Sequence, residues 1–183
     1  KKDGTLVAWM RDNGEAPKRV LRSESNDDGE TWSANEDFDA IPNPGASVEA
    51  IAASPGPMVA VEDVNNHDNV GGIFRNAAAF GAAGVALSPG CVDPLYRKAI
   101  RVSMGAALRV PFAHAEPWAG SLERIRAGGR VLAALTPAPD AVDLDRWDPA
   151  PDDRLRVCWL LGAEGPGLTR AAMDAADVRV RIP

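Results

Sequence analysis

The chain has 183 residues, of which 45% are hydrophobic, enough for one packed domain or a domain with an extension. A formal net charge of −6 gives no general attraction to nucleic acid or anionic membranes, although it leaves room for a local basic patch. No apolar run approaches the roughly 18 residues of a membrane helix, no signal peptide is recognisable, and Cys91 and Cys158 lack metal-ligand spacing. We therefore expect no membrane partner, no metal and a cytoplasmic protein, in which the cysteines suit reduced thiols at least as well as a disulfide.

The acidity is concentrated at the N-terminal end. Residues 1–53 carry 6 basic and 11 acidic side chains, a net of −5, whereas residues 54–183 carry the remaining 14 and 15, a net of −1. The turn-forming stretch SPGP, residues 54–57, lies between them. The composition therefore predicts two units, residues 1–53 and 54–183.

The first unit has the pattern of a β-hairpin. TLVAWM and KRVLRS, residues 5–10 and 18–23, are rich in strand formers, and Asn13-Gly14 between them is a turn signal.

The stretch SNDDGETW follows, with Ser25, Asp27, Gly29, Thr31 and Trp32 at the spacing S-x-D-x-G-x-T-W. Asp and Gly suit a tight turn beneath which the tryptophan can pack. Residues 3–51 resemble one Asp-box repeat of the sialidase-like β-propellers. The resemblance implies a structural turn without catalytic residues, so we expect a small propeller-blade-like segment.

From Pro57 onward, strand-like and helix-like segments alternate. Strands are predicted at residues 57–63, 84–88, 108–113, 130–135, 156–164 and 177–183. Helices are predicted at residues 70–80, 118–129 and 168–176, and the stretch 93–107 is predicted to be helical at first. Asn69 and Asp93 are the predicted N-caps of the first two helices, and Gly128 and Gly129 end the helix at 118–129. This order predicts an α/β fold with a mostly parallel sheet, helices on both faces and a ligand site beyond the carboxyl ends of the strands.

Three loops are candidates for that site. In NVGGIFRN, residues 69–76, two glycines permit a close approach and Arg75 either binds a phosphate or is an ordinary surface arginine. In LLGAEGPGL, residues 160–168, the glycines present backbone groups to a flat ligand, or the loop is a plain strand-to-helix turn with Glu164 favoured by the helix dipole. ALTPAPD, residues 134–140, is the third.

Other polar side chains have simpler interpretations. We expect His67 to be a solvated loop residue and Cys158 to be a core residue. The Asp pairs of the Pro-rich loop are expected to be solvated side chains. Arg97, Lys98 and Arg101 form a basic face that either binds phosphates or is solvated.

Two of these loops and the last strand resemble the motifs of a known family. EDVNNHDNVGGIFRNAAAFGA, residues 62–82, is similar to the first motif of the SpoU (TrmH) branch of the SPOUT RNA methyltransferases. LLGAEGPGL is similar to the second motif, and VRVRIP, residues 178–183, to the strand that enters the third. The connecting segment, residues 88–112, is also similar in order and spacing.

The resemblance implies a SPOUT-type α/β fold with a trefoil knot, incomplete in this stretch because the third motif would follow Pro183. It implies S-adenosylmethionine as the cofactor, methyl transfer to a ribose 2′-OH of rRNA or tRNA, RNA as the partner and a homodimer, with doubtful activity for the stretch alone. The alternative is a fragment of a sialidase-like carbohydrate-active β-propeller protein joined to an inactive methyltransferase piece.

The resemblance also assigns residues by motif. Arg75, Asn69 and Glu164 match catalytic positions. The positions expected to bind the cofactor are Gly162, Ile182, Thr136, Leu161 and Gly167.

Overall fold

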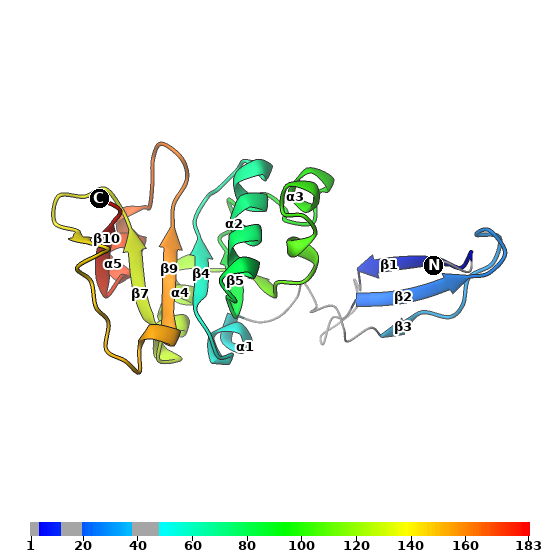
Figure 1. Ribbon diagram of the computed structural model, residues 1–183, viewed down its shortest axis with the longest axis horizontal. Helices are drawn as coiled ribbons and strands as arrows, with labels where there is room; N and C mark the ends of the chain where they lie inside the picture. Colours follow the sequence, from blue (N-terminus) through cyan, green and yellow to red (C-terminus); the bar gives the residue numbers. More distant parts are fainter. Residues whose placement is uncertain (1–3, 12–19, 38–47) are drawn as a thin grey trace.

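The computed structural model describes residues 4–11, 20–37 and 48–183, whose strands form two separate sheets (Figure 1). The smaller sheet is antiparallel, with the order β1 (Leu6–Arg11), β2 (Val20–Ser25) and β3 (Glu36–Asp37). The predicted hairpin is confirmed, with Val7 opposite Glu24. Its predicted Asn13-Gly14 turn lies outside the described residues.

The predicted turn after β2 is also confirmed. Asp27 accepts hydrogen bonds from the Thr31 backbone N–H at 2.9 Å and from the Thr31 and Ser25 hydroxyls. These bonds hold the pKa of Asp27 at about 2, below its usual 3.8, with the Thr31 hydroxyl as the main cause. Trp32 is not buried beneath the turn but is 46% exposed, and its indole N–H donates to the Gly29 carbonyl at 3.1 Å.

The larger sheet has seven strands, all parallel, in the order β6-β5-β4-β9-β7-β10-β8. The strands are β4 (Met58–Val61), β5 (Gly84–Leu87), β6 (Phe112–His114), β7 (Val131–Leu135), β8 (Val142–Asp143), β9 (Val157–Leu161) and β10 (Val178–Arg181). The predicted parallel sheet is confirmed. The strand predicted at residues 108–113 begins only at Phe112, because residues 106–108 form a 3₁₀ turn. The two-residue strand β8, inside the Pro-rich loop, was not predicted.

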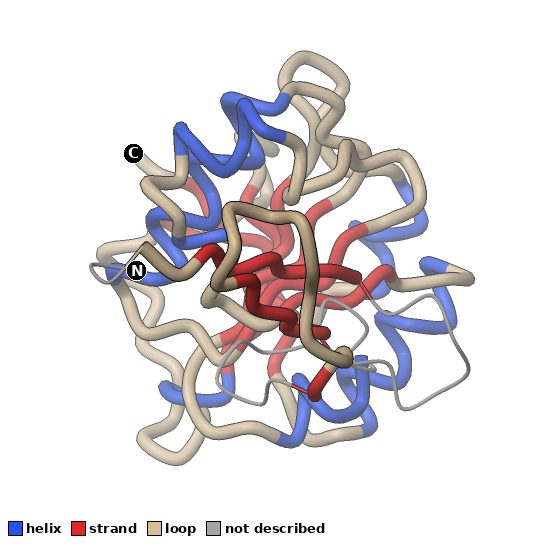
Figure 2. The backbone as a smooth tube through the Cα atoms, turned by 90° about the vertical axis from the view of Figure 1, so that its right-hand side faces the viewer, coloured by secondary structure: helices blue, strands red, loops and turns tan. Residues whose placement is uncertain are grey.

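Helices cover both faces of this sheet, as expected for such a strand order (Figure 2). The helices are α1 (Val48–Ala53), α2 (His67–Ala79), α3 (Arg97–Val102), α4 (Trp118–Ala127) and α5 (Arg170–Ala175), with 3₁₀ turns η1 (Ala106–Leu108) and η2 (Arg154–Arg156). Helices α1, α4 and α5 pack on one face. Helix α2 packs on the other, with α3 and η1 against it. In the described part of the chain no helix is long and apolar enough to cross a membrane.

Side chains of alternate residues divide between the two faces. On β4, Met58 and Ala60 join the core under α4, whereas Val61 joins the core under α2. There Phe74 of α2 meets Phe112 of β6 edge to face, with ring centroids 5.7 Å apart. Both cores are therefore built from the period-two pattern of buried strands.

On the α2 face, no helix among the described residues covers β7, β9 and β10. Trp147 packs edge to face on Trp159 there, with ring centroids 5.4 Å apart. Between these strands and α2 lies an apolar groove of about 460 Å³. Its lining residues are Pro57, Val59, Ile73, Asn76, Ala77, Phe80, Ala82, Leu135, Leu144, Trp159, Leu161 and Ile182.

The predicted N-cap of α2 is wrong. The helix begins at His67, and Asn66 is its N-cap, with an extended backbone and a side-chain oxygen that accepts from the Asp68 N–H at 2.8 Å. Asn66 is the N-cap because its side chain reaches the free N–H group two residues later. Asn69 therefore lies in the first turn, and its amide is available for a contact outside the helix.

The predicted N-cap Asp93 is wrong. The helix expected from Asp93 begins only after Tyr96, as α3. The Asp93 carboxylate instead accepts from the Leu95 N–H at 2.8 Å, in the turn before the helix. The helix ends because Met104 and Gly105 adopt positive φ values of 54° and 78°, which α-helical geometry does not permit.

Helix α1 lies on the N-terminal side of the predicted division at residue 54, which stays a prediction. Ile51 and Ala52 are nonetheless part of the core under α4. Arg130, only 4% exposed, also donates hydrogen bonds to four backbone carbonyls between residues 51 and 56. The end of α1 is thereby fixed to the start of β7.

Candidate active site

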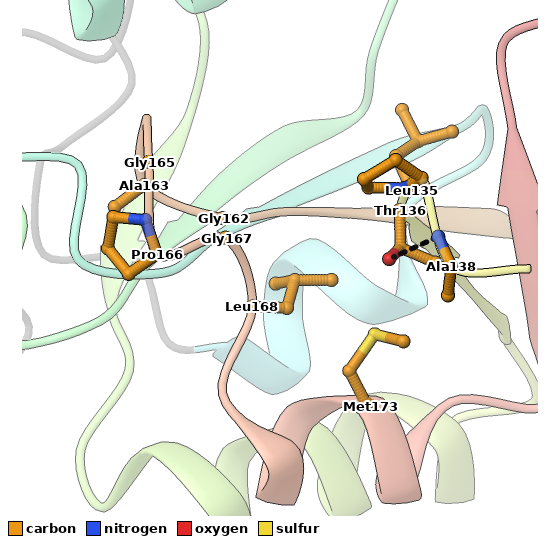
Figure 3. A pocket seen from close by; sticks show the side chains of 11 residues that line it. Leu135, Thr136, Ala138, Gly162, Ala163, Gly165, Pro166, Gly167, Leu168 and Met173 are labelled. Carbon is orange, nitrogen blue, oxygen red and sulfur yellow. Dashed lines mark hydrogen bonds between the residues drawn. The ribbon is translucent and has the colours of Figure 1, made fainter.

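A cavity of about 520 Å³ opens at the carboxyl ends of β7 and β9 (Figure 3). Its walls are the loop after β7, the glycine loop (Gly162–Leu168) after β9, and Met173 of α5. This is where ligands bind in parallel α/β sheets, and the volume is in the range of about 300–1,000 Å³ that small-molecule sites occupy.

The shape of the glycine loop depends on its glycines. A Cβ on Gly162 would lie 2.2 Å from the Gly167 carbonyl carbon, so no side chain fits there. The Gly167 N–H donates to the Ala163 carbonyl at 2.9 Å, and Gly165 and Gly167 have φ values of +95° and +72°. The loop is therefore a narrow turn that presents backbone groups to the cavity.

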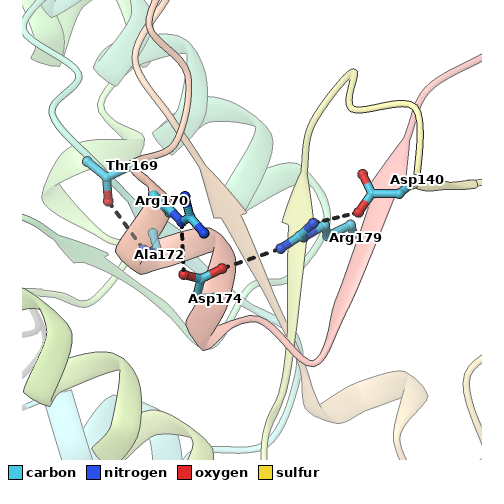
Figure 4. A network of polar contacts seen from close by, with 6 residues as sticks. All are labelled: Asp140, Thr169, Arg170, Ala172, Asp174 and Arg179. Atoms are coloured by element: carbon cyan, nitrogen blue, oxygen red, sulfur yellow. Dashed lines mark hydrogen bonds and ion pairs between the residues drawn. The ribbon is translucent and has the colours of Figure 1, made fainter.

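The opposite wall is tied to its neighbours. The Thr136 N–H donates to the Val180 carbonyl at 2.9 Å. Arg179 of β10 pairs with Asp140 at 2.5 Å and with Asp174 of α5 at 3.5 Å (Figure 4). Exposed pairs contribute little individually, but these join the loop after β7, α5 and β10.

A buried carboxylate behind the glycine loop was missed by sequence reasoning. Glu62, 2% exposed, follows β4 and accepts from the Thr169 N–H at 2.7 Å and from the Thr169 hydroxyl at 2.8 Å. Thr169 is the N-cap of α5, directly after the loop. Glu62 therefore fixes the point where the loop enters α5. The sequence feature that could have identified Glu62 is an acidic residue directly after a buried strand.

The structure brings together Asn69 and Glu164. The Asn69 amide donates to the Glu164 carboxylate at 3.1 Å, which joins the first turn of α2 to the tip of the glycine loop. Glu164 is outside the set of residues that line the cavity. The two motifs, 95 residues apart in sequence, thus form one edge of the site.

Arg75 does not join that pair. It lies six residues beyond Asn69 on α2, about 9 Å further along the axis at 1.5 Å per residue. It is exposed, and no hydrogen bond or ion pair within the described residues engages its guanidinium. Gly71 is buried against α3, where a Cβ would lie 2.8 Å from the Ala99 carbonyl oxygen, so only glycine fits at that position, whereas Gly72 faces open space.

The predicted cofactor residues fall in two places. Thr136, Gly162 and Gly167 line the cavity, whereas Leu161 and Ile182 line the apolar groove on the other side of the sheet. The cavity lining also includes Leu135, Leu168 and Met173 and has no charged side chain. It can hold a flat ligand between backbone polar groups and apolar side chains.

The remaining polar candidates have structural roles. Cys158 is buried in β9, as predicted, and burial raises the pKa of its thiol to about 12. Asp143 pairs with Arg181, which lowers the pKa of the carboxyl. In the described ranges no three His, Cys, Asp or Glu side chains gather as a metal site requires.

Comparison with known proteins gives one consistent set of matches for the larger sheet. Residues 56–183 match the SpoU rRNA Methylase family. The chain is 46% identical over 143 residues to an uncharacterized tRNA/rRNA methyltransferase of Mycobacterium bovis, covering 78% of this chain and 49% of the relative. The chain thus spans about half the length of the curated relatives it matches.

Two solved structures have a similar fold. The AdoMet-bound rRNA methyltransferase of Sinorhizobium meliloti has a TM-score of 0.69 and 28% identity, over 77% of this chain and 52% of that one. An RNA 2′-O ribose methyltransferase has a TM-score of 0.59 and 28% identity, over 81% and 50%.

Residues 1–109 also match the BNR repeat-like domain family. The two matched ranges overlap over residues 56–109. There β4 and β5 pair in parallel around α2, unlike the antiparallel sheets of a propeller. The repeat-like match therefore fits the antiparallel sheet of β1, β2 and β3.

Proposed function

The chain belongs to the SpoU rRNA Methylase family, and from that premise we propose that it transfers a methyl group from S-adenosylmethionine to a ribose 2′-OH of rRNA or tRNA. One observation carries the proposal. The glycine loop walls a cavity on one side and contacts the first turn of α2 on the other, through Glu164 and Asn69.

The cavity fits the cofactor. Its backbone N–H and C=O groups suit the hydrogen-bonding edge of an adenine, and Leu135, Leu168 and Met173 suit the faces of the ring. Thr136, Gly162 and Gly167 would hold it, and when bound it would supply a methyl group on a positively charged sulfur. The relative from Sinorhizobium meliloti is described as AdoMet bound.

The RNA side of the proposal rests on α2. Arg75 is exposed and unengaged within the described residues, so its guanidinium can hold an RNA phosphate and orient the hydroxyl beside it. Asn69 and Glu164 keep the first turn of α2 and the glycine loop together while RNA binds. One of the similar structures is named an RNA 2′-O ribose methyltransferase, which supports the choice of hydroxyl.

A homodimer and a trefoil knot belong to the same proposal, as does a cytoplasmic location, where rRNA and tRNA are found. Within one chain Arg75 does not join the cavity residues, and an active site made by two copies accounts for that separation. The apolar groove, with Phe80 and Ile182 exposed at 80% and 74%, offers surface for such packing.

The cofactor test compares two glycines. Gly162→Ala places a methyl group against Gly167, so we expect S-adenosylmethionine affinity to fall at least tenfold by calorimetry. Gly72→Ala is the matched control, because a Cβ there meets nothing within 4 Å, and its affinity should stay within twofold. Wild-type protein that is folded but binds no S-adenosylmethionine would contradict the proposal.

The transfer test uses Arg75→Ala with radiolabelled cofactor and RNA. We expect methyl transfer to fall at least 100-fold with cofactor affinity unchanged, because Arg75 is assigned to RNA. The wild-type product should contain alkali-resistant dinucleotides, since a methylated 2′-OH cannot attack the adjacent phosphate. Label on a base, or loss of cofactor binding in Arg75→Ala, would overturn these assignments.

A further inference from the structure

The chain exposes its single tyrosine at the start of α3. Tyr96 is 56% exposed, and within the described residues its hydroxyl makes no hydrogen bond. The ring lies against His67, with centroids 4.3 Å apart and planes at 40°. We expected His67 to be a solvated loop residue, but it is the first residue of α2 and is half-buried. The fold neither buries the tyrosine ring nor uses its hydroxyl, so the pair is available for a ligand.

The backbone holds this pair in place. In the turn before α3, the Asp93 carboxylate accepts from the Leu95 N–H, and the Asp93 carbonyl accepts from the Tyr96 N–H at 3.1 Å. Gly71 lets α2 and α3 approach closely, as described above. Lys98 pairs with Asp68 at 2.6 Å across the same two helices. A ligand therefore meets rings whose positions are already set, which lowers the entropic cost of binding.

The surroundings are basic although the chain is acidic. Residues 93–109 contain Arg97, Lys98, Arg101 and Arg109 against one acid, Asp93, a net of +3 in a chain of net −6. Arg97 and Arg101 are exposed, and no ion pair within the described ranges engages them. An exposed tyrosine ring close in sequence to exposed arginines is a combination that binds single-stranded nucleic acid, with bases on the ring and phosphates on the guanidinium groups.

The pair and the proposed active site share the first turn of α2. His67 is two residues before Asn69, so the two side chains point to different sides of the helix, and Asn69 contacts the glycine loop. A ribose presented there carries a base and neighbouring nucleotides that need a surface. RNA is recognised largely through unstacked bases placed on aromatic side chains.

We propose that Tyr96 and His67 form a stacking platform for a nucleobase of the single-stranded RNA that carries the methylated nucleotide. This inference rests on the proposed function and adds to it the form of the substrate, a loop or single strand. Stacking accepts any base because every base has a π face. Arg97 and Arg101 supply the phosphate contacts beside the platform.

The test measures binding of single-stranded RNA oligonucleotides by fluorescence anisotropy at several salt concentrations. Tyr96→Leu keeps an apolar side chain but removes the ring, and we expect it to weaken binding about tenfold. Tyr96→Phe keeps the ring and should stay within twofold of wild type. The slope of log K against log salt should be unchanged in Tyr96→Leu and about one unit shallower in Arg101→Ala.

The outcomes separate the two proposals. RNA binding by wild type that Tyr96→Leu leaves unchanged overturns the platform and leaves the proposed function standing. Absence of RNA binding by wild-type protein that binds S-adenosylmethionine overturns both. A loss of affinity in Tyr96→Leu that coincides with a change of oligomeric state in sedimentation assigns the ring to contact between copies, which also overturns the platform.

Discussion

The three-stranded sheet holds its turn with side-chain hydrogen bonds between near neighbours, whereas the seven-stranded sheet is held by contacts between distant parts of the chain. In the described part of the chain, the hydrogen bonds to the Asp27 carboxylate come from residues within four positions of it. Glu62 and Thr169, by contrast, are 107 residues apart. Asn69 and Glu164 are 95 apart.

This difference explains why only one of the two sheets carries a candidate site. A turn built from adjacent residues satisfies its own polar groups and leaves none to converge on a ligand. In the parallel sheet, loops from distant strands must meet at one edge, because all the strands point the same way. The glycine loop and the first turn of α2 meet there for that reason.

Arg130 gives the largest expected effect on the seven-stranded sheet. Arg130→Met removes a guanidinium that donates to four carbonyls between residues 51 and 56, two of them in buried hydrogen bonds, and leaves the buried Ala52 carbonyl without this donor. We expect the free energy of unfolding to fall by about 2–4 kcal/mol, measured by urea denaturation with tryptophan fluorescence.

Arg170→Met is the matched control. Arg170 is 94% exposed and makes one surface pair with Asp174, so its loss should change the free energy of unfolding by less than about 0.5 kcal/mol. If the two variants were equally stable, α1 would not be anchored to β7 as the structure indicates.

Glu62 gives an intermediate effect that is local to the glycine loop. Glu62→Gln replaces one acceptor oxygen by an NH₂ group next to the two donors of Thr169. We expect a loss of about 1–2 kcal/mol in the free energy of unfolding and about a tenfold loss of S-adenosylmethionine affinity, because the loop entrance loses its fixed position. Calorimetry measures the affinity.

Thr169→Ser distinguishes the hydrogen bonds between Glu62 and Thr169 from the packing around Thr169 as the cause of these losses. It keeps both the N–H and the hydroxyl that Glu62 accepts from, so stability and affinity should remain near wild type. Equal losses in Glu62→Gln and Thr169→Ser would show that packing at the Thr169 methyl group, and not the hydrogen bonds, positions the loop.

Much of the fold could be predicted because the spacing of apolar residues and the positions of helix-ending glycines are local features of the sequence. The buried runs at 58–61, 84–87 and 157–161 are strands, and Gly128 and Gly129 end α4 as expected. The errors arose where two local signals compete. Asn66 and Asn69 are both good N-caps, and only the backbone geometry decides between them.

The site was less predictable because the sequence does not show which of its distant residues come into contact in the fold. The motif resemblance placed Asn69 and Arg75 in one half of a split site and Glu164 in the other, and only the structure shows that Asn69 is the residue that contacts Glu164. Nothing in the sequence distinguished Gly71, which serves helix packing, from Gly72, which faces open space. Glu62 was overlooked because an acid after a buried strand is ordinary until its partner, 107 residues later, is known.

The smallest expected effect belongs to the three-stranded sheet, and it is a pH dependence. The folded turn holds the pKa of Asp27 at about 2, below the 3.8 of an unfolded chain, mainly through the Thr31 hydroxyl. The carboxylate therefore stabilises the turn fully above pH 3.8, and this contribution is lost as the pH falls through 2. The Thr31 amide shift, followed by NMR, should titrate with a midpoint near 2.

Asp27→Asn should abolish that titration and loosen the turn, while amide exchange in β4 and β9 stays unchanged, because the turn's bonds are all local. Asp28→Asn is the control, since Asp28 has a φ of 57°, which asparagine tolerates. A Thr31 midpoint near 3.8 would mean that the turn's bonds do not persist in solution. A change of exchange in β4 would mean that the two sheets support each other, and the contrast between a self-contained turn and a long-range site would no longer hold.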